Sequence, residues 1–181
     1  MISTIEIVNA GFTNSLDLIA VQFNSSSGQR INSSNILITN ANGRVVFNGV
    51  TNISNTITTT SNIYDIVFNG NTTVGANANF INGGKVTLAS TTNFNGSAYF
   101  SNAGSLDASG TIIVSGSLNV QRPLNISNSL QLFLTSPNNT FGSTVTGNSQ
   151  VTINNGGTLV VSGNSPQFTG NFVVNSSVVN S

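Results

Sequence analysis

A short pattern recurs along this 181-residue chain: an apolar residue, then Asn, Ser or Thr, then Gly. Its copies begin at Phe47, Phe68, Phe94, Val114, Val145, Val161 and Phe168. The first four copies follow one another at similar intervals, and the interval from Val114 to Val145 is longer. One turn of a parallel β-solenoid needs a length like the shorter intervals, because it contains two or three short strands with a turn after each. The pattern therefore predicts stacked coils of about 20–26 residues each.

Between the copies of this pattern, apolar residues alternate with polar ones, as Val86 and Leu88 do around Thr87. A spacing of two is the period of a β-strand, and helical spacing is nearly absent. The runs are short and end at Gly or Asn, which indicates an all-β protein with many short strands. Residues 14–21 are the exception, because they fit either a helix or one more strand over 18–23.

In a solenoid, like residues stack on like residues, because each coil lies one strand spacing above the last. A Phe would lie over a Phe, and an Asn at a corner would hydrogen-bond the Asn of the next coil. Gly would supply the positive φ that a tight corner demands. Stacked like charges would repel, which agrees with a content of only 4% charged residues. We therefore predict a right-handed parallel β-helix (β-solenoid) of about eight coils.

The Asn-Gly dipeptides favour a second architecture. They occur at Asn42, Asn48, Asn69, Asn82, Asn95 and Asn155. Asn-Gly is the strongest short-range signal for a β-hairpin, in which neighbouring strands are antiparallel. An antiparallel sandwich or barrel is therefore the alternative fold.

The repeats divide the chain into two parts. We expect residues 1–35 to form an N-terminal cap or the first coil, and residues 36–181 to form the β-solenoid repeats. The long interval from Val114 to Val145 contains Pro123 and Pro137, which restrict the backbone and remove hydrogen-bond donors. A longer loop or widened coil is therefore expected near 121–142.

An exposed loop on a regular scaffold is where binding usually resides. The stretch 121–142 is therefore the expected contact surface. Its candidate contact residues are Arg122, Pro123, Pro137, Asn138 and Asn139. The other interpretation of Arg122, as of Arg30, Arg44 and Lys85, is a solvated surface charge.

Composition excludes several kinds of chemistry. The chain has no His and no Cys, so it offers neither a Ser-His-Asp or Cys-His nucleophile nor a His/Cys zinc site. With only four Lys and Arg residues, it cannot build the basic surface that nucleic-acid binding requires. Its apolar runs are far shorter than the ~20 residues of a membrane-spanning helix. We expect no catalytic, cofactor-binding or metal-binding residues, no nucleic-acid partner and no transmembrane segment.

Parallel β-helices include enzymes that act on polysaccharides, which need clustered carboxylates on one face. Asp65 and Asp107 lie about two predicted coils apart in the sequence, and the alternation places both on the outside of one face. Their expected separation is about 10 Å, too wide for the two groups to share a proton. A carbohydrate-active enzyme is therefore a remote alternative, and we do not expect an enzyme.

Three kinds of segment point to a known family. Segment 157–163 (Gly-Thr-Leu-Val-Val-Ser-Gly), followed by 167–170, resembles the repeats of bacterial autotransporter passenger domains. The Asn-rich segment 67–72 is similar to the surface cell antigens of rickettsiae. Phe-x-x-Asn segments such as 68–71 are similar to an element of chlamydial polymorphic membrane proteins, whose Gly-Gly-Ala element and cysteines this chain lacks.

The resemblance extends over residues 36–181 and implies a right-handed β-helix that is displayed at the cell surface. It assigns no functional residue, because such passengers share a scaffold and not a site. A secretory signal has a basic segment followed by an apolar run. The first six residues have no such arrangement. We therefore expect a piece of a longer precursor behind an added Met.

The expected function is that of a non-enzymatic, bacterial cell-surface or secreted passenger fragment, acting as an adhesin or a structural stalk. Its location would be the cell surface or the extracellular space, and a host-cell receptor or glycan would be its partner. A viral or phage fibre, or a self-assembling filament subunit, is the alternative from another class. Open solenoid ends would then allow end-to-end or homo-oligomeric association.

Overall fold

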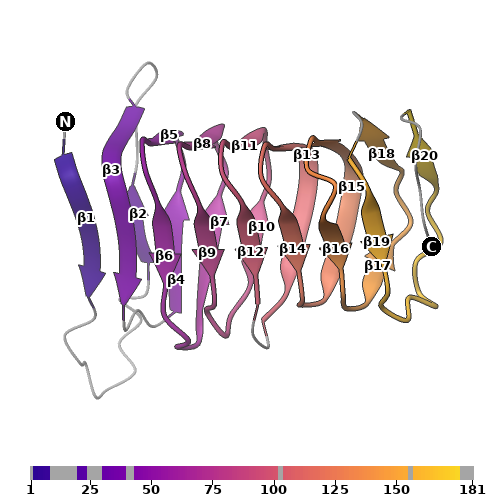
Figure 1. The fold of residues 1–181 in the computed structure, drawn as a ribbon. Helices are drawn as coiled ribbons and strands as arrows, with labels where there is room; N and C mark the ends of the chain where they lie inside the picture. The colour runs from indigo at the N-terminus through magenta and orange to yellow at the C-terminus, as the bar shows by residue number, and fades with distance from the viewer. Residues whose placement is uncertain are drawn as a thin grey trace.

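The computed structural model describes residues 2–8, 20–23, 30–39, 43–101, 104–154 and 157–175. These residues form twenty β-strands and no helix. The paired strands are parallel throughout, and the chain makes about seven turns around one axis (Figure 1). The predicted all-β solenoid is therefore confirmed, and the antiparallel alternative is wrong.

The strand pairings define three ladders, which we call sheets 1, 2 and 3. Sheet 1 contains β2 (Ala20–Phe23), β4 (Gly43–Phe47), β7 (Tyr64–Phe68), β10 (Val86–Leu88), the first parts of β13 (Leu106–Val114) and β15 (Leu124–Leu134), and β17 (Val145–Gly147). Sheet 2 contains the first part of β3 (Arg30–Thr39), β5 (Val50–Ile53), β8 (Thr72–Val74), β11 (Thr92–Phe94), the second parts of β13 and β15, β18 (Val151–Asn154) and β20 (Phe172–Val174). Strand β1 (Ile2–Val8) pairs mainly with the second part of β3 and therefore belongs to sheet 3. Sheet 3 contains the second part of β3, β6 (Ile57–Thr59), β9 (Ala78–Phe80), β12 (Ala98–Phe100), β14 (Leu118–Val120), β16 (Asn139–Phe141) and β19 (Leu159–Val161).

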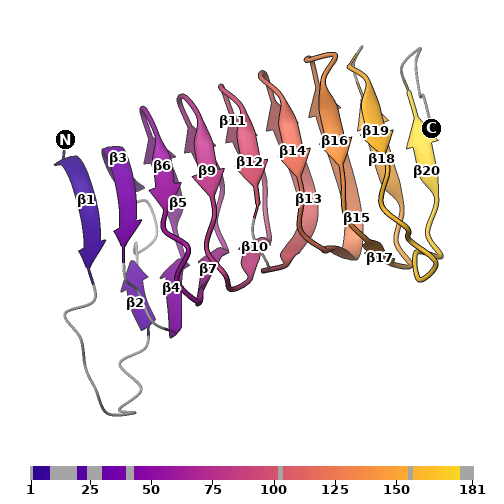
Figure 2. The same cartoon turned by 60° about the horizontal axis from the view of Figure 1, so that its bottom comes forward.

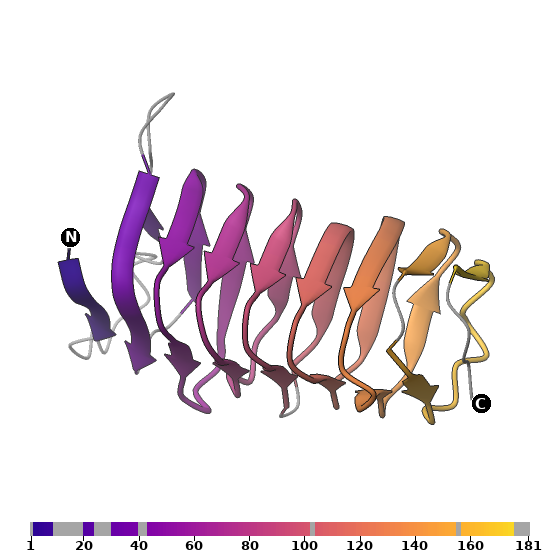
Figure 3. The ribbon, with the colours of Figure 1, turned by 45° about the horizontal axis from the view of Figure 1, so that its top comes forward.

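The turned views show corresponding strands side by side along the length of the rod, with β1 (Ile2–Val8) and β20 (Phe172–Val174) at opposite ends of it (Figures 2 and 3). At the N-terminal end, β1 pairs with β3 and β2 pairs with β4. The boundary expected between residues 35 and 36 thus falls inside a strand. Residues 20–23 form β2, whereas residues 14–19, the rest of the helix-or-strand segment, lie outside the described residues.

Successive coils are nearly equal in length. Val45 pairs with Ile66, Ile66 with Val86 and Val86 with Leu106, so each of these turns advances the numbering by twenty or twenty-one. The next turn is shorter, because Leu106 pairs with Leu124. The observed coil length is therefore near or below the lower end of the predicted range.

The prediction of a longer loop or widened coil near 121–142 is wrong. Strand β15 occupies half of that stretch, and the turn from Leu124 to Val145 is as long as the one from Val45 to Ile66. The long interval in the sequence arises because copies of the Gly pattern fall at different corners of the coil. Val114 ends a strand of sheet 2, whereas Val145 begins a strand of sheet 1. A distance between unlike corners is not a coil length, and this caused the error.

The inner sides of the three sheets enclose one apolar core that runs along the rod. Phe47 stacks on Phe68 with ring centroids 4.7 Å apart, and Phe80 stacks on Phe100 at 4.9 Å. An edge contact between Phe68 and Phe80, at 6.3 Å, joins the two stacks. The predicted placement of Phe over Phe is therefore confirmed for both pairs.

Asparagine side chains link successive coils on the outside. Asn69 Nδ2 donates to Asn48 Oδ1 at 2.7 Å, and Asn52 Nδ2 donates to Asn32 Oδ1 at 3.1 Å. Each pair lies one coil apart. The predicted ladder of corner asparagines is confirmed at Asn48 and Asn69, whereas Asn32 and Asn52 form the same link from within strands. An uncharged amide can repeat in this way because it carries both a donor and an acceptor.

Among the described corner glycines of the recurrent pattern, the predicted positive φ is confirmed at one and is replaced by another role elsewhere. In the described part of the chain, positive φ occurs at Gly43, Gly110 and Gly147, and only Gly147 belongs to the recurrent pattern. Gly96 lacks a positive φ, but a Cβ there would lie 2.6 Å from the carbonyl carbon of Ala76 in the coil below. Close approach of two backbones therefore explains this glycine, and the prediction of positive φ is wrong for it.

Replacing Gly96 with alanine is expected to lower the free energy of unfolding by about 1–3 kcal/mol, because two coils must separate to admit the methyl group. Gly83 is a matched control: an added Cβ would lie 3.2 Å from Cγ1 of Ile63, a side chain that is exposed and free to shift. Gly83→Ala should cost less than about 1 kcal/mol. Urea unfolding followed by circular dichroism compares the two variants, and equal losses would contradict this explanation.

Candidate functional site

The structure separates the predicted contact residues. Arg122 and Pro123 lie in the corner between β14 and β15, whereas Pro137 and Asn138 lie in the corner between β15 and β16. These two corners belong to different edges of the coil, with the whole of β15 between them. Pro123, Pro137 and Asn138 are exposed, but Arg122 and Asn139 are buried. The stretch is therefore not one exposed loop.

Asn139 ties three coils together from the inside. Its Oδ1 accepts from the backbone N–H of Leu118 at 2.8 Å, and its Nδ2 donates to the carbonyls of Ser136 at 2.6 Å and Thr158 at 2.9 Å. The hydrogen-bonding groups of this buried amide are thus satisfied by backbone groups of the fold. Asn139 is therefore a structural residue and not a contact residue.

Arg122 is the largest departure from the sequence-based expectation. Only 1% of its surface is exposed, so the interpretation as a solvated charge is wrong. Its Nη2 donates to the carbonyls of Phe80 at 2.9 Å and Asn82 at 3.0 Å, and also to the carbonyl of Ser101. Its Nη1 donates to the carbonyl of Gly84 at 3.3 Å. The guanidinium thus binds backbone of the two preceding coils.

The corner lengths explain why Arg122 fits inside. Five positions separate β9 from β10 and β12 from β13 in the two preceding coils, whereas three separate β14 from β15. The longer corners place their carbonyls around the space that the Arg122 side chain fills. The alternation that buries Leu118 and Val120 continues to Arg122 and Leu124. That continuation through the corner is the signal that could have predicted its burial.

Burial of the guanidinium lowers the pKa of Arg122 to about 10, through loss of hydration of the charged form. The group is therefore still a cation at neutral pH. In the described part of the chain, backbone carbonyl dipoles rather than a carboxylate stabilise the positive charge of the guanidinium.

This pKa predicts a specific pH dependence. The difference in unfolding free energy between the wild type and Arg122→Met should be constant from about pH 6 to pH 9. Above pH 10 it should shift in favour of the wild type, because the unfolded chain then binds the proton more tightly than the folded chain. Urea unfolding at each pH measures the difference, since all other titratable groups are shared. A shift toward the variant above pH 10 would contradict the lowered pKa.

Four other charged residues alternate in sign along the outside of sheet 1. Arg44 Nη2 lies 3.9 Å from Asp65 Oδ2, and Lys85 Nζ lies 3.0 Å from Asp107 Oδ2. The backbone N–H of Lys85 also donates to Asp65 Oδ1 at 2.8 Å. Asp65 and Asp107 are both on the outside of sheet 1, as predicted, with a lysine in the coil between them. Each carboxylate therefore faces a cation and not the other carboxylate.

No cluster of three or more Asp, Glu, His or Cys side chains occurs among the residues that the structure describes. In the same part of the chain, no helix is long and apolar enough to cross a bilayer.

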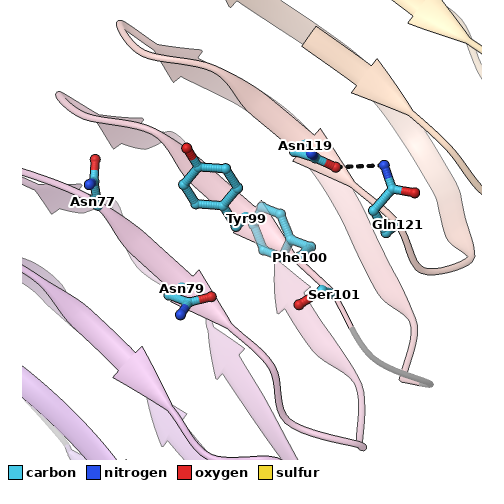
Figure 4. Close-up of a pocket in the computed structure, with 7 residues that line it drawn as sticks. All are labelled: Asn77, Asn79, Tyr99, Phe100, Ser101, Asn119 and Gln121. Atoms are coloured by element: carbon cyan, nitrogen blue, oxygen red, sulfur yellow. Dashed lines mark hydrogen bonds between the residues drawn. The ribbon is translucent and has the colours of Figure 1, made fainter. Parts of the chain in front are cut away.

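The most distinctive surface lies on the outside of sheet 3, around Tyr99 (Figure 4). Tyr99 pairs in register with Asn79 of the coil below and with Asn119 of the coil above. Its side chain is 40% exposed. It borders a pocket of about 420 Å³ that is also lined by Asn77, Asn79, Ser101, Asn119 and Gln121.

Sequence reasoning missed this surface. The signal is present in Ala98-Tyr99-Phe100, where both neighbours of Tyr99 are buried and the alternation places Tyr99 outward. At the equivalent positions below and above, the outward residue is an asparagine. The exposed ring between these two asparagines offers apolar surface beside hydrogen-bonding groups.

Comparison of this chain with family models, with curated proteins and with solved structures gave no match. The fold and the surface themselves define the class: a β-solenoid repeat protein with an aromatic and amide-lined pocket on one outer sheet.

Proposed function

We propose that this chain is a non-enzymatic rod segment of a bacterial cell-surface or secreted passenger protein, acting as a stalk or an adhesive module. The observation that carries the proposal is the combination of a continuous apolar core with an outer surface of uncharged hydrogen-bonding side chains. A rod of this kind holds a binding surface at a distance, because each coil adds one strand spacing to its length.

The composition of the outer surface supports the adhesive role. Asn, Ser and Thr make up 78 of the 181 residues, and the outward positions of the strands carry many of them. Hydroxyl and amide groups donate and accept hydrogen bonds without adding net charge. Such a surface suits a host-cell receptor or a glycan as the partner.

The carboxylates argue against the enzymatic alternative. Asp107 is ion-paired with Lys85, and Asp65 accepts from a backbone N–H and lies near Arg44. Both carboxylates are therefore engaged in contacts on sheet 1. General acid–base hydrolysis of a glycoside would instead need two carboxyl groups facing one another across a substrate.

Immunogold labelling of the organism that carries the gene tests the location. Antibodies raised against the 181-residue chain should label intact cells as strongly as permeabilised cells. Labelling that requires permeabilisation would contradict a surface or secreted rod. Antibodies against a cytoplasmic enzyme of the same organism control for cell integrity.

A filament or fibre subunit is a second candidate, because β20, the last strand among the described residues, has exposed apolar side chains. Phe172 and Val173 of β20 are 40% and 37% exposed, and the Phe172 ring lies 4.9 Å from that of Phe168. Another solenoid end could cover this edge. Light scattering across a concentration series should then show growing mass that Phe172→Ser abolishes. A constant monomer mass would exclude this candidate.

A further inference from the structure

The pocket beside Tyr99 has the features of a ligand site. The ring lies between Asn77 and Asn79 on one side and Asn119 and Gln121 on the other (Figure 4). The Tyr99 side chain projects outward, whereas the neighbouring Phe100 is fully buried in the core. Stability therefore accounts for Phe100 but not for an exposed aromatic ring at the next position.

The amides around the ring retain unused hydrogen-bonding groups. Gln121 Nε2 donates to Asn119 Oδ1 at 2.7 Å, so the Nδ2 of Asn119 and the Oε1 of Gln121 are outside that bond. Asn77 Oδ1 accepts from the backbone N–H of Ser97 at 2.9 Å, which fixes the amide and leaves its Nδ2 group. Hydrogen-bond donors and acceptors thus lie on both sides of the exposed Tyr99 ring.

No charged side chain lines the pocket. The nearby Arg122 directs its guanidinium to backbone carbonyls inside the rod, and the described ion-paired acids lie on sheet 1. An anionic or cationic ligand would therefore meet no opposite charge. The ligand that fits must combine an apolar face with hydroxyl or amide groups around its rim.

We propose that Tyr99 and its flanking amides form a binding subsite for a neutral carbohydrate. A pyranose ring offers a C–H face for the tyrosine ring and a rim of hydroxyl groups, each of which both donates and accepts. A largely apolar surface with a few placed polar groups is the usual make-up of a small-molecule site. The subsite rests on the proposed adhesive role and specifies its ligand class.

Tyrosine fluorescence reports on this subsite directly. The chain has two tyrosines and no tryptophan, and Tyr64 is buried while Tyr99 is exposed. Acrylamide should therefore quench Tyr99 selectively. Chitotriose, cellotriose, maltotriose and lactose are titrated separately against the full 181-residue chain, and saturation-transfer NMR records binding to each sugar independently.

At least one of these neutral sugars should protect Tyr99 from acrylamide and show saturation transfer. Tyr99→Ala should weaken its binding about tenfold or more, as removal of an aromatic anchor usually does. Tyr99→Phe should retain most of the binding in the NMR measurement, because it keeps the ring. Trigalacturonate, an acidic sugar, should bind no more tightly than the neutral ones.

Val160→Ala is the matched control, because Val160 lies in the same outward row of sheet 3 and is also 40% exposed. It should bind the sugar as the wild type does. No binding of any neutral sugar, or an equal loss in Val160→Ala, would overturn the proposal. Tyr99-dependent binding of a neutral peptide such as Gly-Asn-Gly in place of sugars would also overturn it. Each of these results would leave the surface location, tested by immunogold labelling, unaffected.

Discussion

Arg122→Ala is expected to lower the free energy of unfolding by about 3–5 kcal/mol, as loss of one partner from a buried polar cluster does. The guanidinium donates to backbone carbonyls at four residues of the two preceding coils. Alanine would leave those carbonyls with fewer donors in a place that water cannot easily reach, and it would also leave a cavity. Hydrogen exchange should show the loss first at the amides of Asn82 and Ser101, whose carbonyls Arg122 binds.

Arg44→Ala is the matched control for this prediction. It removes the same side chain from an exposed position on sheet 1, where its nearest ion pair is 3.9 Å long and its side chain is 54% exposed. An exposed pair of this kind contributes about 0–1 kcal/mol. Similar losses in the two alanine variants would show that Arg122 does not clamp the coils.

Arg122→Lys separates the geometry of the clamp from its charge. Lysine keeps a cation but replaces the planar fork of the guanidinium with a single ammonium group. It cannot reach carbonyls of two coils in the same arrangement, so its stability should lie between those of the wild type and Arg122→Ala. Wild-type stability in Arg122→Lys would mean that charge alone is sufficient.

The alternation of buried and outward residues along the strands made most of the fold predictable. The residue numbers of the buried positions show why. Between Tyr64 and Leu134, every described buried residue has an even number. The coils from Ile66 to Val86 and from Val86 to Leu106 preserve this parity, because an even number of residues returns the chain to the same side of the strand. The period and the inward positions of this region can therefore be obtained from sequence alone.

The change of the buried positions from even to odd residue numbers shows where the inward residues become harder to predict. After Leu134 the buried positions become odd, starting at Asn139 and Phe141. The coil from Asn119 to Thr140 has an odd length, so the corner shifts the alternation by one. A single sequence cannot locate such a shift within a polar corner, because Asn, Ser and Thr fit either side of the strand. This is the physical reason why Asn138 and Asn139 were grouped although only Asn139 is buried.

The candidate site was not predictable to the same extent. Arg122 was assigned to the surface because an isolated cation normally stays hydrated, and the carbonyls that bind it include those of residues 38–42 positions earlier. The Tyr99 surface depends on which outward residues become neighbours across coils. That neighbourhood follows from the register of β9, β12 and β14, which the mixed spacing of the Gly pattern did not reveal.

Phe100→Ala should cost about 3–5 kcal/mol, because it removes a fully buried ring from the middle of the rod. Phe100 stacks on Phe80 at 4.9 Å and makes an edge contact with Phe94 at 6.2 Å. The aromatic contacts add about 0.5–1.5 kcal/mol each to the area term. Phe100→Leu preserves much of the volume and should lose less than Phe100→Ala.

Phe133→Ala is the control, because Phe133 lies on the outward side of β15 and is only partly buried. It should lose about 1 kcal/mol or less. Urea unfolding followed by circular dichroism ranks the three variants. If Phe133→Ala cost as much as Phe100→Ala, the stacked column would not be the main source of stability.

The loss of stability in Phe100→Ala should also be localised along the rod. In a solenoid each coil contacts only its neighbours, so stability is close to a sum of coil and interface contributions. Phe100→Ala should therefore raise hydrogen exchange in β9, β12 and β14 more than in β18, which lies farther along the rod. A uniform rise over all strands would instead mean that the coils unfold as one unit, and that the Phe stacks do not act locally.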